Sequence, residues 1–139
     1  LVVYFYFIRS VQSWIRGNTP DDFEAVLERA ANACRQRISW QDVSCSVENM
    51  KKIHEEIFGE SLSLKNRKTI DRAPVPIYHD SVINEISQAS SRIRNIKVLE
   101  EIEKFWRKGK NLFILYGASH AVMQEGAIRS ITDNPNLAN

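Results

Sequence analysis

The sequence has few cysteines, and their number and spacing exclude two classes of protein. Its 139 residues contain only Cys34 and Cys45, too few for the disulfide framework of a small secreted domain. Their spacing also lacks the paired-cysteine signature of a zinc site. We therefore expect both thiols to be buried and reduced, which favours a cytoplasmic chain.

Excess charge and long hydrophobic runs are also lacking. The 19 Lys and Arg residues exceed the 17 Asp and Glu residues by two, which is too little to indicate nucleic acid as a partner. The opening apolar run LVVYFYFI ends at Arg9. It is too short to span a bilayer, and it lacks the basic leader and cleavage site of a signal peptide. We expect no membrane span.

Several catalytic motifs are missing as well. The sequence has no Walker loop, no His-Glu-x-x-His and no Gly-x-Ser-x-Gly elbow. None of the enzyme classes that these motifs identify is therefore indicated. What remains is ordinary for a globular protein, with 43% hydrophobic and 26% charged residues. The length is normal for one domain with a real core.

Helical periodicity accounts for most of the chain. Apolar residues recur at steps of three and four, which predicts helices at residues 4–16, 19–35, 46–58, 81–107 and from 119 onward. A strand over residues 1–7 is the alternative at the amino terminus, since β-branched and aromatic residues dominate there. Expected caps are Thr19 and Ser46 at helix starts and Gly17 and Gly59 at helix ends. A short helical turn is expected at residues 39–42.

The parts between these helices are predicted to be polar and solvated. Residues 61–78 form the longest non-periodic stretch and are predicted to be an internal connecting loop, with a basic cluster at Lys65–Lys68. His54 falls on a charged helix face, so a solvated side chain is expected. Residues 133–139 are predicted to be a polar tail.

Residues 108–129 change structural period twice. The run NLFILY at residues 111–116 is almost entirely apolar and bounded by glycines, which is typical of a strand covered on both faces of a sheet. Gly117 ends this run, and a helical pattern follows from Ser119. The predicted fold class is therefore α/β, with several amphipathic helices packed around a small sheet.

His120 is the main candidate for chemistry. It would lie just beyond the carboxyl end of the predicted strand, where open sheets bind their ligands. The positive end of the helix dipole opposes protonation, and a neutral imidazole is what a general base or a metal ligand requires. Gly117 would let a ligand approach the backbone closely. The alternative is a capping or hydrogen-bonded structural histidine. Glu125 points away from His120 and is better placed to pair with Arg129.

A family resemblance rests on these residues. Gly117-Ala118-Ser119-His120 after an apolar run, preceded by a helix carrying Ser91-Arg92-Ile93-Arg94-Asn95, resembles the carboxyl-terminal half of the erythromycin esterase, TraB/Tiki and ChaN-like group. The resemblance covers residues 90–129 and implies part of a larger α/β fold with two halves. It implies that His120 and Arg94 are catalytic and that Gly117, Ser119 and Asn95 bind substrate. In that group's chemistry His120 would act either as a base or as the ligand of a divalent metal.

The chain departs from that group in one respect. Members of the group also carry an earlier Gly-x-x-His or Gly-Glu-x-His near the amino terminus, and this motif has no counterpart here. The first residue of the chain is leucine rather than methionine. We therefore expect residues 1–139 to be a single domain or a carboxyl-terminal fragment that is inactive alone. Arg94 would grip a carboxylate or phosphate through its planar guanidinium, or else form a surface salt pair with a nearby glutamate.

Two classes of function follow from the sequence. The first is a hydrolase of the resembled group, acting on a small molecule or a peptide through His120 and Arg94. The second is a non-catalytic, helix-rich binding or regulatory module in which residues 117–120 only join two structural elements.

Overall fold

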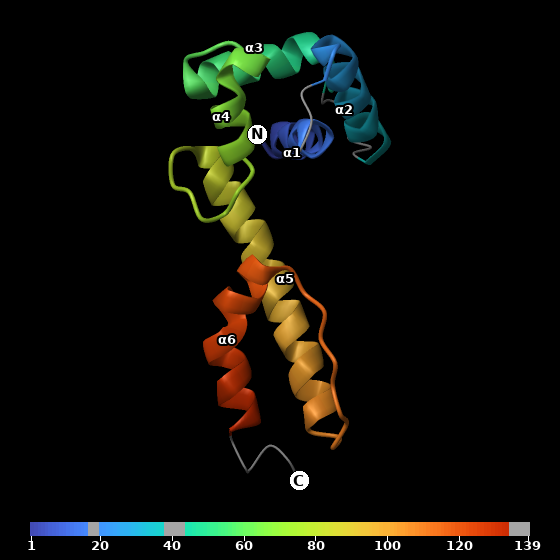
Figure 1. The fold of residues 1–139 in the computed structure, drawn as a ribbon, viewed down its shortest axis with the longest axis vertical. Helices are drawn as coiled ribbons and strands as arrows, with labels where there is room; N and C mark the ends of the chain where they lie inside the picture. Colours follow the sequence, from blue (N-terminus) through green and yellow to red (C-terminus); the bar gives the residue numbers. More distant parts are fainter. Residues whose placement is uncertain (17–19, 38–43, 134–139) are drawn as a thin grey trace. The chain divides into compact units, whose positions relative to one another are not determined.

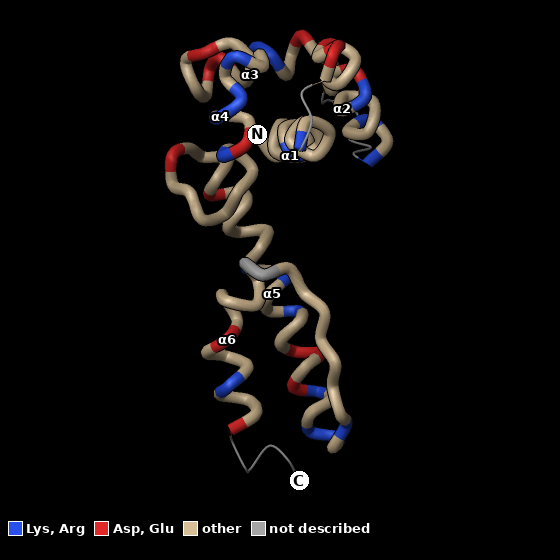
Figure 2. The backbone as a smooth tube through the Cα atoms, viewed as in Figure 1, with Lys and Arg blue, Asp and Glu red and all other residues tan. Residues whose placement is uncertain are grey.

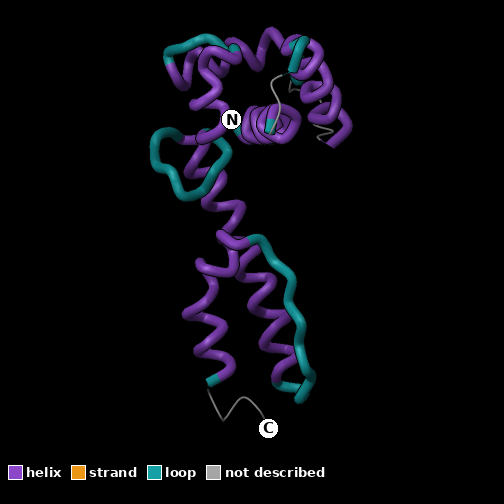
Figure 3. Tube along the Cα trace, viewed as in Figure 1, coloured by secondary structure: helices purple, strands orange, loops and turns teal. Residues whose placement is uncertain are grey.

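The computed structural model describes residues 1–16, 20–37 and 44–133. Within these ranges every regular element is helical, with six α-helices and one 3₁₀ turn at Leu64–Asn66 (Figures 1 and 3). The prediction of an α/β fold with a small sheet is therefore wrong. The chain divides into two compact units, Leu1–Gln88 and Ala89–Asn139. The boundary falls within α5 (Val82–Trp106).

The first unit is built around α1 (Val2–Ile15), which contacts three other helices (Figure 1). These are α2 (Phe23–Arg37), α3 (Val47–Phe58) and α4 (Arg67–Arg72). Tyr4, Phe7 and Ile8 are fully buried, because neighbours on several sides cover the broad apolar surface of α1. A strand over residues 1–7 is therefore wrong. The aromatic and β-branched residues there fill a helical core.

Local capping explains where α2 and α3 begin. The hydroxyl of Ser46 accepts a hydrogen bond from the Asn49 amide at 3.2 Å, and Gly59 ends α3 with a φ of 68°, so the predicted helix over residues 46–58 is confirmed. The α2 helix begins later than predicted, since the carboxylate of Asp22 accepts from the Ala25 amide at 3.0 Å. The expected caps at residues 17 and 19, and the turn at 39–42, lie outside the described residues.

A short helix interrupts the predicted loop over residues 61–78. The six-residue helix α4 is held by tertiary contacts, with Ile70 fully buried in the core. Arg67 forms an ion pair with Asp71 at 3.3 Å and donates to the Ile15 carbonyl of α1 at 3.0 Å. A helix this short has one buried apolar side chain, so its sequence shows no helical period.

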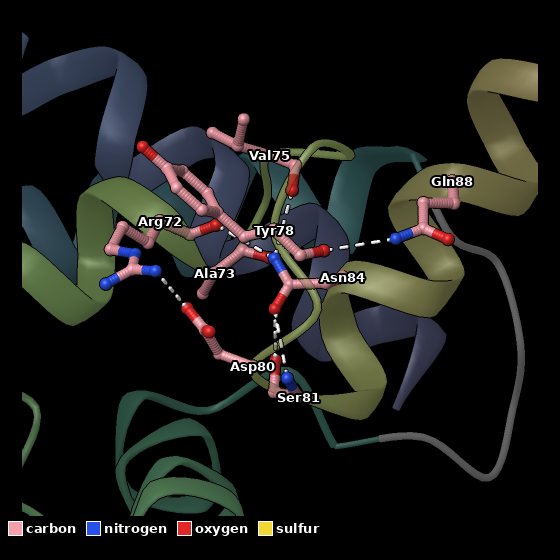
Figure 4. Close-up of polar contacts among 8 residues, drawn as sticks. All are labelled: Arg72, Ala73, Val75, Tyr78, Asp80, Ser81, Asn84 and Gln88. Carbon is pink, nitrogen blue, oxygen red and sulfur yellow. Dashed lines mark hydrogen bonds and ion pairs between the residues drawn. The ribbon is translucent and has the colours of Figure 1, made fainter.

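Asn84 fastens the connection between α4 and α5 (Figure 4). Its Nδ2 lies 3.0 Å from the carbonyl oxygens of Arg72, Ala73 and Val75. Its Oδ1 accepts from the Ser81 amide at 3.1 Å and the Ser81 hydroxyl at 3.0 Å. Ser81 precedes the first residue of α5, so Asn84 takes the place of the acidic residue in a capping box. One side chain thus starts α5 and fixes the preceding loop.

Charge and ring contacts complete this connection. The guanidinium of Arg72 pairs with Asp80 at 2.7 Å and lies 4.3 Å from the centre of the Tyr78 ring. Gln88 donates to the Tyr78 carbonyl at 3.1 Å (Figure 4). The loop is therefore held to the helices on both sides of it.

The second unit contains the rest of α5, a connection at residues 110–117 and α6 (Ala118–Thr132) (Figure 1). The predicted strand at 111–116 is wrong, and in the described chain this segment has no regular structure (Figure 3). A strand needs a partner for its backbone hydrogen bonds, and no other segment supplies one among the described residues. The helices predicted at 81–107 and from 119 are confirmed.

Burial along α5 differs from the predicted apolar stripe. Ile93, Ile96 and Phe105 are exposed, whereas the polar residues Ser91 and Asn95 are buried. Most of the predicted tail, residues 134–139, lies outside the described part of the chain. No described helix combines the length and the apolar content that a bilayer crossing requires.

Candidate functional site

His120, Asn95 and Gln124 form a cluster in the second unit, which we call the amide cluster. His120 and Gln124 lie one turn apart in α6, and Asn95 projects from α5. The Oδ1 atom of Asn95 is 2.7 Å from His120 Nδ1 and 2.9 Å from Gln124 Nε2. Asn95 and Gln124 are buried, and His120 is half-buried. Two helices thus meet through polar side chains.

The hydrogen bonds of the cluster define the histidine tautomer. Because the Asn95 Oδ1 atom can only accept, the Nδ1 atom of His120 carries the proton that it receives. In the neutral ring the lone pair is then on Nε2. The Tyr116 ring lies 4.8 Å from the imidazole, measured between ring centres. The ring of His120 is therefore held from two sides.

Gly117 lies beside the cluster but does not require glycine. It is the residue before α6, and its carbonyl accepts from the amides of His120 at 2.9 Å and Ala121 at 3.1 Å. Its φ of −63° is open to any residue, and an added Cβ would meet His120 at an ordinary 3.9 Å. Neither the backbone conformation nor the neighbouring atoms therefore require glycine at this position. The side chain of Ser119 lies outside what the structure describes.

The side chain of Arg94 points in a different direction from that of Asn95. Neighbouring residues of a helix point about 100° apart, and Arg94 is exposed while Asn95 is buried. Within the described residues Arg94 forms no ion pair with the glutamates that follow it. Those glutamates pair instead with Lys97, Lys104 and Arg107. Of the predicted site residues, the structure therefore brings His120 and Asn95 into contact and leaves Arg94 at the surface.

The amide cluster does not fit a divalent metal. The contacts described for the cluster involve two side-chain amides and a tyrosine ring, whereas hard cations and zinc select carboxylates, histidines or thiolates. Across the described chain, no group of three or more His, Cys, Asp or Glu residues could hold a metal ion. No chemical step is therefore assigned to a metal at His120.

Buried polar residues on α5 are the signal that sequence reasoning passed over. Asn84, Ser87, Ser91 and Asn95 recur at steps of three and four, and all four are buried. Isoleucines that recur along the same helix predicted an apolar stripe instead, but Ile93 and Ile96 face solvent. Gln124 could have been found in the same way, since it lies one turn from His120.

A shallow, open groove lies between α5 and the connection in the second unit. It has a volume of about 440 Å³ and is lined by Lys97, Val98, Glu101, Ile102, Phe105, Leu112, Phe113 and Ile114. Phe113 is 94% exposed, Leu115 is 87% exposed, and Val122 of α6 is 74% exposed. Arg94, Asn95 and His120 do not line this groove.

Basic residues lie along α5 and just before the apolar connection in the chain. Figure 2 shows them along α5 and at the turn that precedes the connection. The four glutamates of the described second unit each pair with a lysine or arginine. Arg92, Arg94, Lys108 and Lys110 have no ion pair within the described part of the chain. The second unit therefore presents apolar side chains together with uncompensated positive charge.

Comparisons with known proteins found no relative of this chain. No protein-family model, curated protein or solved structure matches this chain. The function must therefore be inferred from its own side chains and their arrangement.

Proposed function

We propose that the chain is a non-catalytic helical binding module whose second unit binds an apolar, acidic segment of another protein. The exposure of Phe113 and Leu115 carries this proposal. Both lie in a connection without regular structure, beside a groove of about 440 Å³.

The energetic support comes from burial that the chain itself does not provide. Covering one large apolar side chain contributes about 1.5–3 kcal/mol. Phe113, Leu115 and Val122 keep most of their surface in water, so a partner that covers them gains this contribution on binding. An apolar surface of this kind is more typical of a contact site than of a free surface.

Charge identifies the kind of partner. Arg92, Arg94, Lys108 and Lys110 lack carboxylate partners among the described residues, so acidic side chains on a bound segment would meet compensating charge. The groove itself is mainly apolar, with Lys97 and Glu101 at its polar positions. Leucine or phenylalanine side chains flanked by aspartate or glutamate match this arrangement.

A labelled peptide tests the proposal. The probe is a fluorescein-labelled peptide of alternating leucine and glutamate, titrated with the full chain and followed by fluorescence anisotropy. We expect Phe113→Ser with Leu115→Ser to weaken binding about tenfold or more, since two apolar contacts are lost. A peptide with lysine in place of glutamate should bind more weakly than the acidic one.

Matched controls separate this surface from general stickiness. Leu1→Ser alters an exposed leucine of the first unit and should leave peptide affinity unchanged. Equal affinity for acidic and basic peptides, or binding that survives the double substitution, would contradict the proposal. Preferential binding to anionic lipid vesicles, or self-association in sedimentation, would point to a different occupant.

A hydrolase is the second candidate, and the hydrogen bond between His120 Nδ1 and Asn95 Oδ1 favours it. That bond leaves the lone pair of the neutral ring on Nε2, as a general base requires. This candidate extends the resemblance of residues 117–120 to the erythromycin esterase, TraB/Tiki and ChaN-like group. Arg94 would bind an anionic substrate group from the surface, and the chain alone is expected to be inactive.

Hydrolysis of p-nitrophenyl acetate by the purified chain tests this candidate. Any free imidazole hydrolyses this ester slowly, so His79→Ala, at an exposed histidine of the first unit, is the control. Turnover that falls in His120→Ala and persists in His79→Ala would support the hydrolase and contradict the expected inactivity. Identical rates in both variants would agree with the expected inactivity and would give His120 no part in ester hydrolysis by this chain alone.

A further inference from the structure

The two cysteines of the chain meet in the core of the first unit. Cys34 lies in α2, and Cys45 precedes the Ser46 cap of α3. Their sulfur atoms are 3.6 Å apart, and both residues are buried. The sequence places them eleven positions apart with no recognisable motif, so only the fold reveals the contact.

Further contacts hold both residues in place. The thiol of Cys34 also lies 3.6 Å from the Val3 carbonyl of α1, and the Arg35 guanidinium donates to the Cys45 carbonyl at 3.0 Å. Burial, with a contribution from Cys45, raises the pKa of the Cys34 thiol to about 12. In the folded chain at neutral pH, Cys34 is therefore a protonated thiol and a poor nucleophile.

We propose that Cys34 and Cys45 form an intramolecular disulfide when the chain folds in the presence of a small-molecule disulfide. A disulfide requires sulfur atoms about 2.0 Å apart, so the pair must approach by about 1.6 Å. The bond would join α2 to the start of α3, two elements that already contact each other. Closing this loop restricts the unfolded chain and so stabilises the fold.

The chemistry balances with oxidised glutathione as the oxidant. One cysteine thiolate attacks a glutathione sulfur, forming a mixed disulfide and releasing one reduced glutathione. The second thiolate then attacks the protein sulfur of that mixed disulfide, forming the Cys34–Cys45 bond and releasing the second glutathione. Each cysteine loses one proton, and glutathione receives two electrons. Because the folded pair is buried, the exchange proceeds during folding or through opening of the unit.

Refolding of the full chain in a glutathione redox buffer tests this proposal. The reduced, urea-unfolded chain is diluted into reduced and oxidised glutathione, quenched in acid and treated with N-ethylmaleimide, and its mass is measured. We expect neither cysteine to carry a glutathione or maleimide adduct. After proteolysis, the peptides that contain Cys34 and Cys45 should be found linked to each other. The equilibrium constant for closure should be about a hundredfold larger in native buffer than in concentrated urea. The oxidised chain should unfold about 10 °C above the reduced chain.

Serine variants and the reduced protein complete the experiment. Cys34→Ser and Cys45→Ser should abolish the redox dependence of the unfolding temperature. Should either variant fail to fold, the native-to-urea ratio for the unaltered chain decides the matter alone. Alkylation of both thiols, mixed glutathione adducts without closure, or equal constants in native buffer and urea would each overturn the proposal. Already folded reduced chain should oxidise more slowly than refolding chain.

Discussion

The two units of this chain use apolar residues in opposite ways. In the first unit, aromatic and aliphatic side chains of α1 and α2 are buried, including Phe7, Ile8 and Leu27. In the second unit, two helices meet through Asn95, His120 and Gln124, while Phe113 and Leu115 face solvent. The first unit thus stabilises itself with apolar contacts, and the second leaves large apolar side chains exposed to solvent.

This difference shows that hydrophobicity alone does not identify a core. Both units contain strongly apolar runs, at residues 1–8 and 111–116. The first run has helical neighbours on several sides, whereas the second leaves Phe113 and Leu115 almost fully exposed. The surroundings of an apolar residue therefore decide whether it contributes to stability or to recognition.

The same substitution in the two units should test the comparison most strongly. Leu27→Ala empties a fully buried site, and we expect it to lower the free energy of unfolding by about 2–5 kcal/mol. Leu115→Ala removes an exposed side chain and should change stability by less than about 0.5 kcal/mol. Urea unfolding followed by circular dichroism measures both. Comparable losses in the two variants would show that the contrast is wrong.

The amide cluster should contribute less than the apolar core. Asn95→Ala removes the acceptor shared by His120 and Gln124, and leaving these donors unpaired should cost about 1–3 kcal/mol. Asn95→Asp keeps an acceptor oxygen and serves as the control. Hydrogen exchange of α6 amides and the His120 ring N–H signal report the change. Unaltered protection of α6 in Asn95→Ala would contradict a structural role for the cluster.

A polar pair inside the first unit should make its stability depend on pH. The Tyr4 hydroxyl lies 2.5 Å from His54 Nδ1, and His54 is fully buried. Burial lowers the pKa of His54 below its usual value of about 6.5, despite an opposing effect of Glu60. The unfolded chain therefore binds a proton at a higher pH than the folded one, and stability is lost as pH falls below about 6.5.

Urea midpoints measured from neutral to mildly acidic pH check this dependence. The loss should continue until pH passes below the folded pKa of His54 and then stop growing from this source. His54→Leu should flatten the curve over this range, whereas His79→Ala, at an exposed histidine, should leave it unchanged. A midpoint that rises as pH falls through this range would reverse the predicted sign.

Exposed ion pairs should have the smallest effect. Arg129 and Glu125 lie 3.0 Å apart on the surface of α6, as the sequence predicts. Arg129→Ala should lower stability by about 0.3–0.5 kcal/mol at low ionic strength. High salt should reduce this difference. A loss as large as that of Asn95→Ala would mean that surface charge, rather than the amide cluster, stabilises the second unit.

Periodicity predicted most helices because they carry buried or capped residues at regular steps. The helix over residues 46–58 was predicted at both ends, since Ser46 and Gly59 act locally. The helix α4 was missed because Ile70 is its one buried residue, and a single apolar residue shows no helical period. The strand at 111–116 was wrong, because an apolar run does not reveal whether a partner strand exists.

The candidate site was predictable only in part. His120 and Asn95 were named from the sequence, and the structure places them in contact. Burial of His54 was missed, because the charged neighbours Lys52 and Glu55 face outward while His54 meets Tyr4 of a distant segment. The approach of Cys34 to Cys45 depends on how α2 and α3 pack, which spacing in the sequence does not encode.

The side-chain amide of Asn84 joins two roles that an exchange of one atom would separate. Its nitrogen faces three carbonyl oxygens, and an aspartate at this position would replace that nitrogen with a carboxylate oxygen that has no hydrogen to share with them. The aspartate would still accept from Ser81, so α5 would keep its cap. The loop at residues 72–75 would thus lose its attachment to the helix while the helix start stayed intact.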